Sequence, residues 1–305
     1  MENISMIKTA GIEQNNKKSD AKGSLAAIAA SQGIALAAVP PSLLAIKGLT
    51  NSAKGLDSFQ KENIKTAAKN VLDTTGLTQK GVKLNDFKNA GLDFSTMPDK
   101  LKEMLNPIYA TAKGKNAFFG GLNGTKMVGG GRMFKNEVVC NMDKLPTAIF
   151  HEIGHAYNAN SSKFWKAVQG MRGPAMVIGA GLALFCALTK SSKPSDNANG
   201  ELTGAQKAKN FVRENSGKLA FLSMVPVLAE EGMATIRGNA WAKQMLSPDI
   251  AKKVSKGNKI AYISYIAAAA GVAAEAHFAT KIKDNFTDKK DNDNSKNVIM
   301  YSHQG

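Results

Sequence analysis

The chain has 305 residues, with 40 Lys and Arg against 24 Asp and Glu, so its formal net charge is +16. A hydrophobic content of 43% argues against a wholly disordered chain, and the length suffices for one large domain or two ordinary ones. The two isolated cysteines, Cys140 and Cys186, provide neither a disulfide framework nor a Cys-based zinc site. Because lysines flank apolar stretches and no arginine-rich or zinc-finger pattern occurs, we expect membrane lipids as partners and no nucleic acid.

The N-terminal part of the chain indicates a polar lead followed by a membrane-associated region. Residues 1–22 are polar and predict a flexible segment. Residues 23–46 carry no charge and are long enough to cross a bilayer. Because Pro40-Pro41 would break a helix near its end, a spanning helix and a helix lying on the membrane both remain open. We assign 23–95 to an N-terminal helical, membrane-associated region.

A change of composition near residue 116 predicts a mixed domain. Residues 116–140 are glycine-rich and then β-branched, which is typical of short strands joined by turns. Residues 145–160 return to a helical pattern, with Asp143 available as a cap and Pro146 in the first turn. We therefore expect a domain over 96–245 that is mainly α-helical with a small β-sheet.

Apolar segments follow within and after this domain. An apolar insert lies around 173–229, and its first part, 173–189, is uncharged and at the lower length limit for a membrane helix. A buried core helix is the alternative for that segment. Beyond the domain we expect a C-terminal apolar helix over 246–280. The polar composition of 281–305 predicts a disordered tail.

The sharpest local signal is the sequence His-Glu-Ile-Gly-His at 151–155. On a helix, residues four apart lie on one face, so His151 and His155 can share one Zn²⁺. Glu152 then projects beside the metal, where it can take a proton from zinc-bound water. Only four histidines occur in the chain, which makes a chance match rare, and two surface histidines on an amphipathic helix are the alternative interpretation.

A catalytic zinc ion takes three protein ligands and keeps one position open for water. His277, His303 and a downstream carboxylate are the options for the third ligand, and His303 lies in the polar tail. Glu230 and Glu231 end an apolar run, where a buried carboxylate would need a partner such as a metal. A surface glutamate at a helix start is the alternative for one of them.

Three blocks of the sequence resemble the gluzincin metallopeptidases of the HtpX and CAAX prenyl protease type. Asn116-Ala117-Phe118 is similar to the strand that precedes the active-site edge strand of that family, and residues 137–140 are similar to the edge strand itself. The zinc-helix motif matches the form H-E-x-G-H. The family's later E-x-x-A-D pattern matches Glu231 to Ala234 in register, but Thr235 stands where the family has an Asp that supports a ligand histidine.

This resemblance, which covers about residues 95–245, implies a zincin-like metalloprotease core with one zinc ion per chain. His151, His155 and Glu231 would bind zinc, and Glu152 would be the catalytic base. Asn116, Val138 and Val139 would bind a polypeptide substrate, which the strand at 137–140 would hold by β-addition. Tyr157 and Arg237 are options for the oxyanion donor by chemistry alone.

The resulting expectation is a zinc-dependent endopeptidase, integral to the membrane, that hydrolyses peptide bonds of membrane or membrane-associated proteins. The alternative is a catalytically degenerate zinc-binding membrane-associated protein, which the replacement of the family's Asp by Thr235 favours. His155 and Glu231 must meet at one metal. The chain between them therefore crosses a bilayer twice or not at all.

Overall fold

A computed structural model describes residues 24–26, 47–88, 107–126, 133–194 and 197–302 of the chain. The polar lead expected at 1–22 and nearly all of the uncharged segment 23–46 lie outside the described residues. Within the described residues the protein is mainly helical with a small β-sheet, as the sequence predicts.

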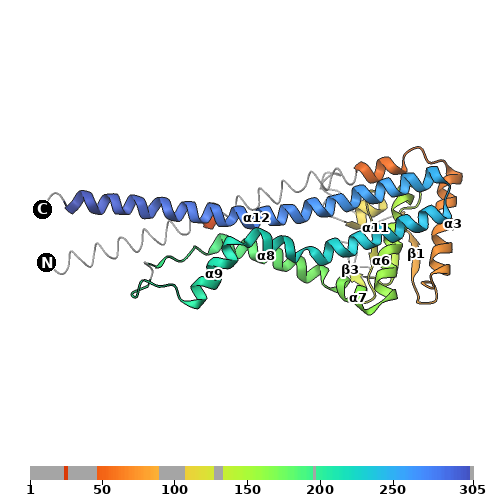
Figure 1. Ribbon diagram of the computed structural model, residues 1–305. Coiled ribbons are helices and arrows are strands. Elements are labelled where there is room, and N and C mark those ends of the chain that lie inside the picture. Colours follow the sequence, from red (N-terminus) through yellow and green to blue (C-terminus); the bar gives the residue numbers. More distant parts are fainter. Residues whose placement is uncertain (1–23, 27–46, 89–106, 127–132, 195–196, 303–305) are drawn as a thin grey trace. The chain divides into compact units, whose positions relative to one another are not determined.

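Most of the elements are helices (Figure 1). They are α3 (Ser58–Thr74), α5 (Pro107–Ala112), α6 (Ile149–Ser161), α7 (Lys163–Gly170), α8 (Arg172–Leu188), α9 (Gly204–Glu214), α10 (Ser216–Ser223), α11 (Val225–Met245) and α12 (Pro248–Ser302), with a short 3-10 helix η1 (Pro146–Ala148) before α6. Residues 47–53 are also helical. The strands are β1 (Lys83–Asp86), β2 (Ala117–Gly120), β3 (Thr125–Lys126), β4 (Met133–Phe134) and β5 (Glu137–Cys140).

The chain divides into two compact units that are discontinuous in sequence. The first, here called the sheet unit, comprises residues 40–173 and 225–267, and it contains all five strands. The second, here called the helical unit, comprises residues 1–39, 174–224 and 268–305. The domain boundaries expected from sequence remain a prediction.

The main sheet of the sheet unit has the strand order β1-β5-β2, with β1 parallel and β2 antiparallel to β5. The expectation that residues 137–140 form an edge strand is therefore wrong. Both edges of β5 are hydrogen-bonded to neighbouring strands, so its backbone has no free groups to pair with an added substrate strand. Strands β3 and β4 form a separate two-stranded sheet.

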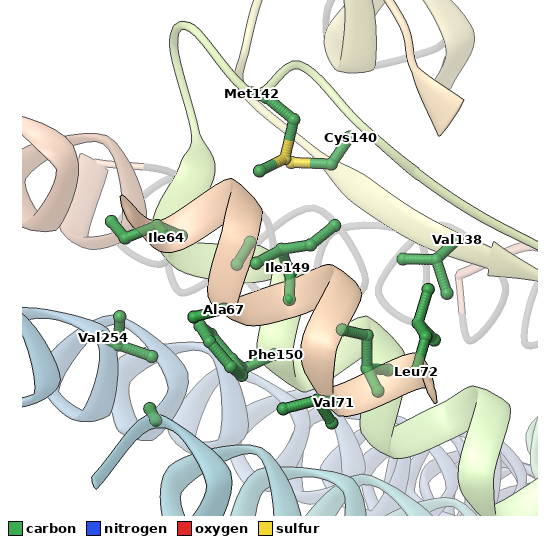
Figure 2. Packing of buried hydrophobic residues seen from close by; sticks show 14 of the residues in the cluster. Ile64, Ala67, Val71, Leu72, Val138, Cys140, Met142, Ile149, Phe150 and Val254 are labelled. Atoms are coloured by element: carbon green, nitrogen blue, oxygen red, sulfur yellow. The ribbon is translucent and has the colours of Figure 1, made fainter. Parts of the chain in front are cut away.

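The core of the sheet unit forms where α3 and α6 pack together beside β5 (Figure 2). Helix α3 starts at a capping box in which Asp57 and Gln60 satisfy each other's backbone N–H groups. Its residues at helical spacing, including Ile64, Ala68 and Val71, are fully buried. Ile149 and Phe150 of α6 face this side, so the helix that carries the zinc motif is anchored by its apolar face.

The helical unit packs through small side chains. Ala183, Ala220 and Ala276 form one buried cluster, and Cys186 and Ala279 belong to another. Small residues let helix backbones approach closely, a mode of packing that is common between helices in membranes.

Arg213, which is 1% exposed, adds polar contacts to this unit. It donates to the Cys186 carbonyl oxygen at 2.8 Å and to Asp284 Oδ1 at 2.7 Å, and its Nη1 also contacts Thr189.

Three helical stretches among the described residues are long and apolar enough to cross a bilayer: Lys163–Leu188, Ser216–Met245 and Pro248–Phe286. The expected membrane association is compatible with them. Because His155 and Glu231 lie close together in the sheet unit, a crossing by the first stretch requires a second crossing before Glu231.

Candidate metal centre

Helix α6 places the zinc motif. Its start is prepared by η1, in which Pro146 stands in the first turn, and Ser162 lies at its end in an extended conformation that begins α7. His151 and His155 are one turn apart on the same face and are 5% and 4% exposed. Because the opposite face is held in the core, these imidazoles have a fixed direction.

Helix α11 meets α6 at unusually close range because two glycines lie at the contact. A Cβ atom at Gly154 would come within 2.5 Å of the Ala234 carbonyl oxygen, and one at Gly238 would come within 2.6 Å of the Phe150 carbonyl oxygen. Only glycine permits this approach. The glycine within the His-Glu-Ile-Gly-His motif therefore has a packing role, which is to bring Glu231 to the two histidines.

Three donor atoms converge at this crossing. Glu231 Oε2 lies 3.1 Å from His151 Nε2 and 3.4 Å from His155 Nε2, and the two Nε2 atoms are 3.0 Å apart. Ligands at about 2.0–2.1 Å from a tetrahedral zinc ion would be separated from one another by roughly 3.3–3.4 Å. This buried group of two imidazoles and a carboxylate is therefore able to hold a metal ion, and its nitrogen and oxygen donors suit zinc.

The other nitrogen of each imidazole has a partner as well. Glu230 Oε1 lies 2.8 Å from His155 Nδ1, and Thr235 Oγ1 lies 3.2 Å from His151 Nδ1. Such outer contacts fix the tautomer that leaves Nε2 available to a metal. The two adjacent glutamates thus differ in role: Glu231 faces the cluster of Nε2 atoms, whereas Glu230 supports one histidine from behind. Thr235 occupies the supporting place that the resemblance assigns to an Asp.

Arg172 is a site residue that sequence reasoning missed. Its Nη1 donates to Glu230 Oε2 at 2.8 Å and its Nη2 donates to Glu231 Oε1, so one guanidinium holds both buried carboxylates. This contact leaves Oε2 of Glu231 directed at the histidines. The sequence signal for Arg172 was weak, because a basic residue at the end of an apolar run is ordinarily a flanking charge.

The electrostatics of α6 follow from burial. Burial raises the pKa of the Glu152 carboxyl, although the nearby histidines oppose this shift. For His155, burial lowers the pKa, but Glu230 and Glu231 raise it more strongly, so its pKa lies well above the ordinary value. A metal ion binds the neutral imidazole, so it competes with a proton for His155.

The remaining residues considered for the site are not among the three metal donors, and their roles stay predictions. Val138 and Val139 are fully buried in β5, and Asn116 immediately precedes β2 at a half-buried position. Tyr157 packs edge-on against Trp241, and Arg237 covers the Tyr157 ring at 4.8 Å, so this pair forms a packing cluster.

Of the two other histidines considered as ligands, the one among the described residues, His277, is not part of the metal cluster. His277 belongs to the helical unit, where its ring contacts Phe278, and His303 lies outside the described residues.

No family model, curated protein or solved structure matches the chain.

Proposed function

We propose that the protein is a zinc-dependent endopeptidase with a zincin-like core that acts on membrane or membrane-associated polypeptides. The observation that carries the proposal is the convergence of His151, His155 and Glu231 beside Glu152 on one buried helix crossing. Two imidazoles and a carboxylate are the ligand set of one class of catalytic zinc site, and this set leaves a fourth position for water or substrate.

Each residue of the site would have a separate role in peptide hydrolysis. A zinc ion in this cluster would supply a Lewis acid and lower the pKa of water at the site. Glu152 would accept a proton from that water at its carboxylate and then deliver the proton to the leaving amine. Burial raises the pKa of this carboxyl toward neutral pH, which favours both proton transfers. Glu230 and Thr235 would hold the imidazoles in the tautomer that the metal needs.

A cleft of about 610 Å³ in the sheet unit adjoins the site through Arg172, although neither Glu152 nor the three metal-cluster residues line it. It is lined by Phe119 of β2, by lysines of α7, and by Gln169 and Arg172, of which Arg172 contacts Glu231. Strand β2 ends the three-stranded sheet, so a substrate strand would add to β2 rather than to β5. The apolar stretches of the chain favour substrates at a membrane.

A second candidate function is a catalytically degenerate zinc-binding protein of the membrane. The observation in its favour is burial: Glu152 is 7% exposed and Glu231 is fully buried. A metal closed off from substrate would stabilise the contact between α6 and α11 without performing chemistry.

Zinc content and peptide cleavage together test both candidates. We expect about one zinc ion per wild-type chain in detergent, strong loss in Glu231→Ala, and retention in Glu152→Gln. Casein cleavage should require zinc and disappear in Glu152→Gln, while the exposed substitution Glu62→Gln should change neither property. Zinc without cleavage would select the degenerate protein. A wild-type protein without zinc, or cleavage that survives Glu152→Gln, would refute the endopeptidase.

A further inference from the structure

Lysines make up more than half of the residues that line a second concave surface in the sheet unit. This hollow, of about 560 Å³, is separate from the metal cluster and shares no residue with it. Six ammonium groups line it, from four segments that are distant in sequence: Lys47, Lys54, Lys61, Lys113, Lys115 and Lys144. We call it the lysine hollow.

The segments around the lysine hollow are held in place by buried contacts. Asn141 Nδ2 donates to the Ala112 carbonyl oxygen at 2.6 Å, which joins the two turns that carry Lys113 to Lys115 and Lys144. Gly114 has a φ of +71°, and a Cβ there would lie 2.2 Å from Lys144 Cβ, so these turns are in direct contact. The lysines are therefore presented by a rigid base rather than by free loops.

A further buried contact holds helical residues 47–53 at the edge of the hollow. The hydroxyl groups of Ser52 and Thr147 lie 2.9 Å apart, and they tie helical residues 47–53 to η1. Lys47 and Lys54 stand at the two ends of that helical segment. The relative positions of the lysine backbones are thus determined before any ligand arrives, which reduces the entropy cost of binding.

The positive charge of the hollow is only slightly offset by the protein. Asp143 is the single acidic residue in its lining, and the Lys88 ammonium lies 2.9 Å from it. The hydrogen bond from Lys88 lowers the pKa of Asp143, so this carboxylate is already paired. Like charges gathered on a concave surface repel one another and focus a positive field, and an anion bound among them relieves that repulsion.

We propose that the lysine hollow binds a ligand with several clustered phosphate groups, either the headgroup of an anionic lipid or a soluble polyphosphate compound. Lysine is a point-charge binder of phosphate, and six of them call for more than one negative charge. The lining contains neither arginine nor an aromatic residue. Nucleic-acid channels commonly use such side chains to stack bases, so the compact hollow favours a small, highly charged group.

The full-length protein in non-ionic detergent allows both sources to be tested. Tripolyphosphate, titrated calorimetrically, represents soluble compounds. Capture of fluorescent phosphatidylinositol bisphosphate in mixed micelles, compared with phosphatidylcholine, represents lipid headgroups. The test variant carries Lys54→Gln, Lys113→Gln and Lys144→Gln. Its matched control has the same net charge and carries substitutions at exposed lysines outside the hollow, Lys69→Gln, Lys83→Gln and Lys243→Gln.

We expect at least one probe to bind at low salt and to lose about 100-fold in affinity in the test variant, with little change in the control. Binding of tripolyphosphate would identify a soluble ligand, and binding of the anionic lipid alone would identify a headgroup. Failure of both probes, or an equal loss in the two variants, would overturn the proposal. Tighter lysine-dependent binding of duplex DNA than of either probe would also overturn it. Zinc content serves as a folding check and is expected to be unchanged.

Discussion

Gly154 provides the most direct test of how the two helices build the metal cluster. In Gly154→Ala, the new methyl group would lie 2.5 Å from the Ala234 carbonyl oxygen and 2.7 Å from its Cα atom. Ordinary van der Waals contact begins at 3.4 Å, so α11 must retreat by about 0.9 Å. Both neighbouring atoms belong to the backbone, and no side-chain rotation can relieve the clash.

The size of the effect follows from two opposing terms. Overpacking of this kind costs about 1–3 kcal/mol, whereas Ala in place of a helical Gly contributes about 0.5–1 kcal/mol of stability. The net loss should be about 0.5–2 kcal/mol. Zinc binding should suffer more, because a shift of about 0.9 Å moves Glu231 away from imidazoles that now lie 3.1 and 3.4 Å from its Oε2 atom. We expect a 10- to 100-fold weaker affinity, comparable with the loss of an outer-shell partner.

Thermal melting in detergent and competition with a zinc chelator measure the two effects. Gly181→Ala is the matched control, because Gly181 lies within α8 and a Cβ there would meet no atom within 4 Å. The control should bind zinc like the wild type. If Gly154→Ala also melts and binds zinc like the wild type, then the close approach of α6 and α11 does not position Glu231, and the reasoning fails.

Three further predictions concern single contacts. Thr235→Val removes the hydroxyl beside His151 and should weaken zinc binding about 10-fold in the same chelator competition. Thr235→Asp should keep the wild-type zinc affinity. Unchanged affinity in the Val variant would contradict a supporting role of Thr235 for His151. Arg213→Met should destabilise the helical unit by about 1.5–3 kcal/mol in thermal melting, because it removes the hydrogen bonds that this buried guanidinium donates to the Cys186 carbonyl oxygen and to Asp284. A stability like that of the wild type would refute this estimate. Burial raises the pKa of the Cys140 thiol well above its ordinary value. In a Cys186→Ser background, the Cys140 thiol of the folded protein should therefore stay protonated and resist alkylation even at pH 9. Rapid labelling of the folded protein would contradict this prediction.

The raised pKa of the Cys140 thiol also makes the stability of the fold depend on pH. A thiol whose pKa is raised by folding contributes stability below the pKa of the unfolded chain, and this contribution falls as pH rises above about 8.5. The melting temperature of the Cys186→Ser protein should therefore decline in alkaline solution more steeply than that of a variant that also carries Cys140→Ala. Parallel declines would show that this thiol does not titrate on unfolding.

Features that depend on local periodicity could be predicted from the residues alone. Helical spacing places His151 and His155 on one face, whatever the rest of the fold, because residues four apart are always neighbours on a helix. The long uncharged runs likewise predict apolar helices, and three suitable stretches occur in the structure. The mainly helical class with a small sheet follows from the same local patterns.

Features that depend on contacts between distant segments became visible only in the folded protein. Glu230 and Glu231 are adjacent in sequence, and the resemblance favours Glu231 by register alone, whereas the packing of α11 on α6 through Gly154 and Gly238 is what brings its carboxylate to the two Nε2 atoms across 80 residues of chain. The central place of β5 is set by strands on both sides of it, which no local pattern reveals. Arg172 and the lysine hollow were equally hidden, because isolated basic residues acquire a meaning only when folding brings them to one carboxylate pair or one concave surface.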